Sequence, residues 1–172
     1  MTVKYEIKFL DYWHLSSGLS AGVKHDSLVV KDMDGLPFVP GKTFKGLVKE
    51  MAELLGKDGF VKTCFGREGV EMGACYFTNA KIDEAVKKQI VSNNLKDNLY
   101  DEIASTQIED GMAVDNSLRE IEVVIPISLH GEINDVPSEY ITELKQSLRM
   151  IKRMGLNRNR GLGRCSVIVE DA

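Results

Sequence analysis

Short stretches in which apolar and polar residues alternate predict β-strands at several places in the chain. Every second side chain of a strand faces the same side of a sheet, so a period of two is typical of a strand with one buried face. The strongest such signal is the isoleucine- and valine-rich stretch at 118–133. Other strands are predicted at 3–13, 74–82 and 165–171, and two short ones are expected around a hairpin turn at Asp34-Gly35.

Two helices are predicted where apolar residues recur every three or four positions. The first covers residues 43–56, and we expect Thr43 to cap its amino end and Gly56 to end it. Its other face carries Lys42, Lys45 and Lys49. The second helix opens at Pro137-Ser138, and its apolar stripe consists of Ile141, Leu144, Leu148, Ile151 and Met154.

Without insertions, the predicted order is strand, helix, strand, strand, helix, strand. This is the order of the α+β ferredoxin-like (RRM-like) fold, an antiparallel sheet with two helices on one face. A chain of 172 residues suits one domain, so we expect a single domain at 1–172 with a polar insertion at about 83–117. The open sheet face and nearby loops of such folds commonly bind RNA, although a fold alone does not establish function.

Composition limits the kinds of partner. The chain has 26 acidic and 22 basic residues and a net charge of -4, so binding to nucleic acid would require a local basic surface. We find neither a signal-peptide pattern nor an apolar run of roughly 20 residues, which favours a cytoplasmic protein without a membrane partner. The three cysteines are widely spaced, which favours buried thiols over a zinc site or disulfides.

The segment 40–46, PGKTFKG, resembles part of a phosphate-binding loop. The Walker pattern needs a glycine at position 36, where this chain has Leu36, so the match fails. A helix amino end with adjacent lysines is still a good phosphate site. Lys42, Thr43 and Lys45 are therefore candidate RNA-binding residues, and a capped helix with a solvated lysine face is the alternative.

A second candidate is the glycine-arginine loop, defined here as residues 155–164, GLNRNRGLGR. Glycines let a backbone approach a ligand closely, and arginines make forked contacts to phosphates. The loop follows a predicted helix and precedes a strand, the reverse of a dinucleotide-binding motif. A plain connection is the alternative. The candidate RNA-binding residues of this loop are Gly155, Arg158, Arg160, Gly161, Gly163 and Arg164.

The first loop, defined here as the segment from His14 to the turn at Asp34-Gly35, contains histidines and aspartates. His14 closes the first predicted strand, and a structural role is as well supported as a functional one. Asp32 and Asp34 flank the predicted turn, which explains them without chemistry. Asp26, beside His25, could serve in catalysis, but aspartates in loops are usually turn residues.

Taken in order, these segments resemble the RAMP superfamily of CRISPR-associated proteins, from residue 3 to the last strand. The residues at 14–18 are similar to a histidine-and-glycine loop of that family, and 36–46, LPFVPGKTFKG, closely follows one of its motifs and departs from it mainly at Lys42. Phe65-Gly66 and the segment from Leu118 to Glu122 resemble two further motifs. The glycine-arginine loop resembles the family's carboxyl-terminal glycine-rich loop.

Within the superfamily, the stretch from Asp26 to the LPFVPG segment most resembles the repeated backbone subunit of type III effector complexes. The resemblance implies binding to a CRISPR guide RNA and a target RNA, with other RAMP and CRISPR effector subunits as partners. It also implies RNA contact at His14, and it assigns Asp26 to target RNA cleavage with a transiently held Mg²⁺ or Mn²⁺. Residues 106–117 would form a thumb with Met112 and Val114 as wedges.

Two alternatives stay open. The chain is shorter than most backbone subunits, and its thumb region is acidic at Glu109, Asp110 and Asp115, so it could be a non-catalytic RAMP subunit. It could also be a guide-processing RAMP endoribonuclease with His14 or His25 as general acid–base. Enzymes of that second kind usually carry two tandem ferredoxin-like domains, which 172 residues do not accommodate comfortably.

Overall fold

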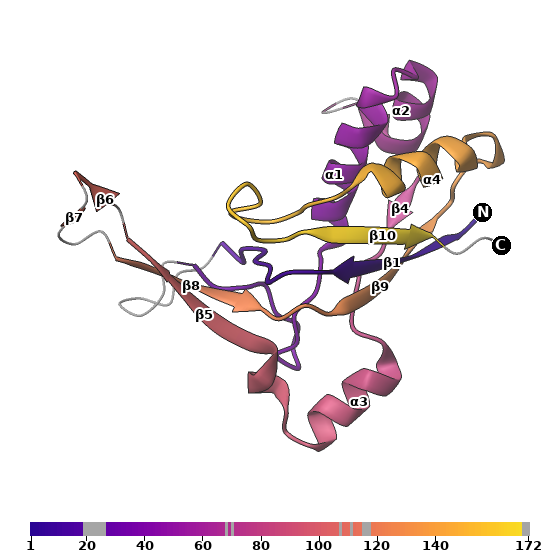
Figure 1. The fold of residues 1–172 in the computed structure, drawn as a ribbon. Coiled ribbons are helices and arrows are strands. Elements are labelled where there is room, and N and C mark those ends of the chain that lie inside the picture. The colour runs from indigo at the N-terminus through magenta and orange to yellow at the C-terminus, as the bar shows by residue number, and fades with distance from the viewer. Residues whose placement is uncertain are drawn as a thin grey trace.

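A four-stranded antiparallel sheet forms the centre of the computed structural model (Figure 1). Its strands are β1 (Val3–Phe9), β4 (Tyr76–Phe77), β9 (Ser128–Asn134) and β10 (Cys165–Val169), in the order β10-β1-β9-β4. This is the strand order of the ferredoxin-like fold, so the predicted fold class is confirmed. The residues that the structure describes are 1–18, 27–67, 69, 71–106, 108–110, 112–114 and 118–169.

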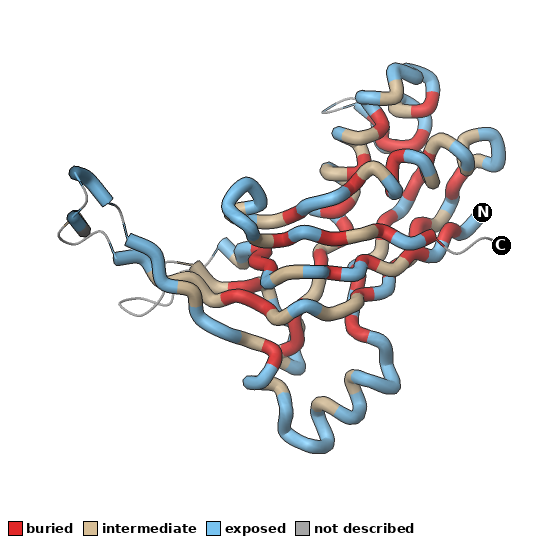
Figure 2. Tube along the Cα trace, viewed as in Figure 1, coloured by how far each residue is buried: buried red, intermediate tan, exposed pale blue. Residues whose placement is uncertain are grey.

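Helices α1 (Gly41–Leu54) and α4 (Ile141–Met150) cover one face of the sheet, and α2 (Asp58–Phe65) packs against α1 (Figure 1). Every second residue of strand β1 is buried, which is the pattern of a sheet covered on one side (Figure 2). The buried residues of β1 belong to the core, and the Tyr5 ring stacks on Phe44 of α1. The 3₁₀ turn η2 (Ser138–Tyr140) leads into α4. The predicted stripe of α4 is confirmed, since Leu144, Leu148 and Ile151 are at most 2% exposed.

The amino end of α1 differs from the prediction. The helix begins at Gly41, two residues before Thr43, and no side chain of its own N-cap residue, Pro40, caps it. The Gly41 N–H instead donates to Asn79 Oδ1 at 2.9 Å. A Cβ at Gly41 would collide with the carbonyl oxygen of Phe77, so glycine allows α1 to start directly against β4. The predicted Thr43 cap is wrong, and the predicted end at Gly56 is confirmed by its positive φ of 68°.

The stretch predicted as one long strand at 118–133 is two strands in different sheets. Strand β8 (Arg119–Val124) pairs with β5 (Tyr100–Ser105), and β9 starts only at Ser128. Pro126 lies between them and has no N–H to give to a sheet, which explains the break. The two strands expected around Asp34-Gly35 reduce to a turn with a single bridge from Lys31 to Pro37.

The polar insertion predicted at about 83–117 holds a helix and most of a β-ribbon. Helix α3 (Glu84–Ser92) and the 3₁₀ turn η1 (Lys96–Leu99) precede β5. The β5–β8 ribbon projects from the body, and its far end carries the short strands β6 (Ile108–Glu109) and β7 (Met112–Ala113) (Figure 1). A second small hairpin, of β2 (Gly66–Arg67) and β3 (Glu71–Met72), follows α2.

All three cysteines are buried, as predicted. Burial raises the pKa of the Cys165 thiol to about 11, which keeps it protonated and unreactive at neutral pH. Within the described part of the chain, no helix has the length and apolar character needed to span a bilayer.

Candidate nucleic-acid interface

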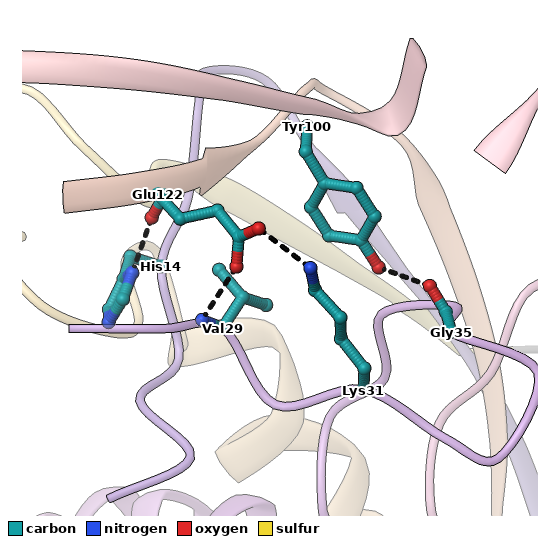
Figure 3. Close-up of polar contacts among 6 residues, drawn as sticks. All are labelled: His14, Val29, Lys31, Gly35, Tyr100 and Glu122. Atoms are coloured by element: carbon teal, nitrogen blue, oxygen red, sulfur yellow. Dashed lines mark hydrogen bonds and ion pairs between the residues drawn. The ribbon is translucent and has the colours of Figure 1, made fainter. Parts of the chain in front are cut away.

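Glu122 of β8 fastens the first loop to the base of the ribbon (Figure 3). Its carboxylate accepts the Val29 N–H at 3.0 Å and a hydrogen bond from Lys31 Nζ at 2.6 Å. Its main-chain carbonyl oxygen lies 2.6 Å from His14 Nδ1. These contacts of one residue hold the first loop, and the Glu122 side chain is only 13% exposed.

His14 is fully buried within this network. A carbonyl oxygen can only accept a hydrogen bond, so Nδ1 carries a proton and donates to Glu122. Nε2 lies 2.9 Å from Ser27 Oγ, and that hydroxyl lies 3.0 Å from Ser16 Oγ. In this conformation the ring has no surface to offer RNA. The structure thus gives His14 the structural role that the sequence left open.

The described end of the first loop is Ser27, the residue after Asp26 in the sequence. Ser27 bridges to Ile121 of β8, and its carbonyl oxygen accepts the Glu122 N–H at 3.4 Å. His25 and Asp26 themselves lie outside the described residues. The chain is thus fixed to the ribbon base at the position that follows the candidate catalytic aspartate.

A second group of contacts ties the same loop to β5 and α3. The Lys31 ammonium lies 3.8 Å from the centre of the Tyr100 ring, and the Tyr100 hydroxyl donates to the Gly35 carbonyl oxygen at 2.7 Å (Figure 3). Burial, and then the nearby Glu122 charge, raise the pKa of Tyr100, so it remains a neutral donor. Lys87 of α3 forms an ion pair with Asp34 at 2.6 Å.

The glycine-arginine loop packs against the segment that leads to His14. The Leu156 N–H donates to the His14 carbonyl oxygen, and the Gly163 N–H donates to that of Tyr12. A Cβ at Gly155 would collide with the His14 carbonyl oxygen, and one at Gly163 with the Met154 carbonyl oxygen. These two glycines therefore admit the protein's own backbone. A Cβ at Gly161 would meet open space.

The three arginines of this loop differ in their contacts. Arg164 forms an ion pair with Asp11, with 3.0 Å between Nε and Oδ2. Arg158 and Arg160 are exposed, and no carboxylate of the described residues pairs with either guanidinium. Arg158 and Arg160 are thus the two arginines of the loop that are available to bind phosphates.

The lysine candidates lie at the other edge of the sheet. Lys42, Thr43 and Lys45 are in the first turns of α1, which starts against the edge strand β4, whereas the glycine-arginine loop leads into the opposite edge strand, β10. Lys42 and Lys45 line a pocket together with Met72 and Tyr76. Sequence reasoning missed these last two residues, because nothing in the pattern relates the β2–β3 hairpin to α1.

The described residues contain no group of three or more histidine, cysteine, aspartate or glutamate side chains arranged to hold a metal ion. Glu122 is linked to Ser27 through His14, and both of its carboxylate oxygens are already hydrogen-bonded within the protein.

We expect Glu122→Ala to destabilise the fold by about 1.5–3 kcal/mol, because it removes a charged acceptor from a partly buried main-chain N–H and from Lys31. Glu122→Gln keeps the acceptor for Val29 and should lose less. Urea unfolding measures both. Glu120→Ala, on the same strand but without an ion pair among the described residues, is the control. Equal losses in the Glu122→Ala and Glu120→Ala variants would contradict the role given to Glu122.

Comparison with known proteins agrees with this architecture. The family model of the RAMP superfamily matches residues 6–166, and no curated protein matches the chain. A chain in the cryo-EM structure of the type III-B Cmr-beta bound to cognate target RNA has a TM-score of 0.77 and 12% identity, covering 98% of this chain and 97% of that one. A chain of the Cmr-beta apo state has a TM-score of 0.76 and 13% identity at the same coverage. Identities this low show a shared fold alone, but the family match spans almost all of the sequence, and the chain therefore belongs to the RAMP superfamily.

Proposed function

We propose that this protein is a guide-RNA-binding subunit of a type III CRISPR effector complex. The observation that carries the proposal is the glycine-arginine loop, which holds Arg158 and Arg160 exposed on a backbone that is hydrogen-bonded to the first loop. Guanidinium groups on a fixed backbone suit phosphate binding, because little conformational freedom is lost when RNA binds. The likeness to a chain of a complex bound to cognate target RNA supports the same proposal.

The β5–β8 ribbon suits the role of a thumb in the guide–target duplex. Ile108 and Met112 at its far end are 67% and 72% exposed, and Leu118 beside β8 is 62% exposed. Apolar side chains at the end of a projecting ribbon can enter between stacked bases and unstack them. Met112, one of the two predicted wedges, has the required exposure, whereas Val114 is half-buried.

Cleavage of the target RNA is the catalytic part of the proposal. A ribose 2′-hydroxyl would attack the adjacent phosphorus in line, which breaks the bond to the 5′ oxygen of the next nucleotide and leaves a 2′,3′-cyclic phosphate. The leaving 5′ oxygen takes a proton from water and becomes a 5′-hydroxyl. Asp26 would take the 2′-hydroxyl proton or hold a divalent cation, Mg²⁺ or Mn²⁺. The fixed Ser27, next to Asp26 in the sequence, supports this assignment, since a catalytic carboxylate needs a positioned backbone.

The partners of such a subunit would be the guide RNA, the target RNA and sister RAMP subunits, assembled in the cytoplasm. A filament subunit contacts its two neighbours through different surfaces, so the contact propagates and does not close. We therefore expect the isolated chain to be a monomer or a loose oligomer. A tight two-fold dimer that persists at high salt without RNA would argue against this assembly.

The test of RNA binding is a pair of double variants of equal charge. Arg158→Ala/Arg160→Ala should weaken binding to unrelated guide sequences and lower the salt dependence of log K by about 1.4, since each lost single-strand phosphate contact contributes about 0.7. Lys88→Ala/Lys96→Ala removes the same charge from α3 and η1 and should change neither quantity. Filter binding at several salt concentrations measures both.

Two results would contradict the proposal. One is equal RNA affinity in both double variants, which would make the glycine-arginine loop a plain connection. The other is the absence of short RNAs with a common 5′ sequence from the protein purified with its sister subunits. Melting temperatures of the variants should match that of the unmodified chain, because both pairs of side chains lie at or near the surface.

A further inference from the structure

The pocket beside the first turns of α1 has the mixed character of a nucleotide site. Its volume is about 530 Å³, within the roughly 300–1,000 Å³ typical of small-ligand pockets. Buried side chains supply an apolar floor, and Lys42 and Lys45 outnumber the one carboxylate of the lining, Glu71. The floor consists of Phe65, Cys75 and Phe77, which are 6%, 3% and 7% exposed.

Lys45 lines the pocket together with the floor residue Cys75. A hydrogen bond with the Cys64 thiol, and the positive charge of Lys45, hold the pKa of the Cys75 thiol below its usual value. An anionic group bound in the pocket would meet a cation there, and the first turn of α1 adds main-chain N–H groups that have no partner within the helix.

Two large side chains of the lining are left in solvent. Met72 is 99% exposed and Tyr76 is 64% exposed. The hairpin that carries Met72 is closely packed. A Cβ at Gly66 would collide with the Glu71 carbonyl oxygen across the hairpin, and one at Gly73 would collide with the Phe65 backbone at the end of α2. Both side chains are thus presented from a closely packed backbone. An exposed aromatic ring beside lysines is the usual arrangement for stacking an unpaired base.

We infer that this pocket binds one nucleotide of a single-stranded RNA segment, with its base against Tyr76 and Met72 and its phosphate beside Lys42 and Lys45. The inference rests on the proposed function, since it takes RNA as the ligand, and it adds a base-binding site at the edge of the sheet opposite the glycine-arginine loop. A flat, apolar base matches the exposed Met72 and Tyr76, and the anionic phosphate joined to it matches Lys42 and Lys45. A purely apolar ligand would leave the two lysines without a partner.

The test uses the full chain and a short single-stranded RNA in which 2-aminopurine replaces each base in turn. At one position the unmodified protein should quench the fluorescence, because the base stacks on Tyr76. Tyr76→Ala should remove this quenching and weaken binding roughly 5- to 150-fold, as expected for the loss of one stacked base. Tyr76→Phe keeps a ring and should bind within about twofold of the unmodified protein.

Met72 supplies a variant that should leave the fold intact, since its side chain is almost wholly in solvent. Met72→Ala should weaken binding at the same RNA position, and Met33→Ala, equally exposed at a distant turn, should not. Unchanged RNA affinity in both Met72→Ala and Tyr76→Ala would overturn the inference while leaving the proposed function intact. The inference would also be overturned if these variants reduced only the assembly with sister subunits, since a protein segment would then fill the pocket. If the unmodified chain bound no RNA, the proposed function itself would fail.

Discussion

In an assembled complex, the replacement of Asp26 by asparagine should reduce target RNA cleavage by about 10²- to 10⁴-fold, the usual contribution of a positioned acid or base. The change removes one negative charge and almost no volume, so target binding should persist. A lone carboxylate is a weak base for a ribose hydroxyl, and we therefore expect cleavage to require Mg²⁺ or Mn²⁺ and to stop in excess chelator. Single-turnover cleavage of a matched, end-labelled RNA measures the rate.

The control for this experiment is Asp32→Asn. Asp32 Oδ1 accepts hydrogen bonds from the Asp34 and Leu36 N–H groups, and asparagine keeps that oxygen, so the turn should survive the loss of charge. Asp32→Asn should cleave at nearly the rate of the unmodified complex. Cleavage that continues unchanged in Asp26→Asn would falsify the catalytic assignment and favour a non-catalytic RAMP subunit that binds the guide without cutting.

The elements that the sequence predicted best are those whose signal is local. The stripe of α4 and the alternation of β1 depend only on neighbours in the chain, and both are present in the structure. The errors come from long-range contacts. The sequence pattern predicted Thr43 as the cap of α1. The side chain that binds the Gly41 N–H is Asn79, which lies 38 residues away in the sequence, so no local pattern could identify it. The apolar run at 118–133 looked continuous, but Pro126 interrupts it. The part before the proline pairs with β5 and the part after it pairs with β1.

In the candidate site, too, the sequence predicted local features and missed long-range contacts. Sequence patterns pointed to the glycine-arginine loop and the lysines of α1, but they could not separate Arg164, which pairs with Asp11, from the free Arg158 and Arg160. They also could not show that Glu122, 108 residues after His14, holds that histidine. A motif indicates which chemistry is available. Which side chains remain free for it depends on contacts between distant parts of the chain.

The glycines of the glycine-arginine loop permit a second decisive experiment, in which two substitutions separate backbone packing from ligand binding. Gly161 and Gly163 both have a positive φ, of 91° and 71°, so alanine at either position pays the cost of a left-handed backbone, about 1–2 kcal/mol. Only Gly163→Ala also drives a Cβ into the Met154 carbonyl oxygen, which adds about 1–3 kcal/mol of overpacking.

We therefore expect the free energy of unfolding to fall by about 2–5 kcal/mol in Gly163→Ala and by about 1–2 kcal/mol in Gly161→Ala, as measured by urea denaturation. RNA affinity should follow the opposite order and fall more in Gly161→Ala than in Gly163→Ala. Gly161 lies between Arg160 and the buried end of the loop, with open space where a Cβ would stand, so a backbone that approaches RNA closely would be blocked there. If Gly161→Ala binds RNA as well as the unmodified chain, the loop contacts RNA through its arginine side chains alone. If the two variants lose equal stability, the contact between Gly163 and Met154 does not constrain the fold, and the packing explanation for Gly163 is wrong.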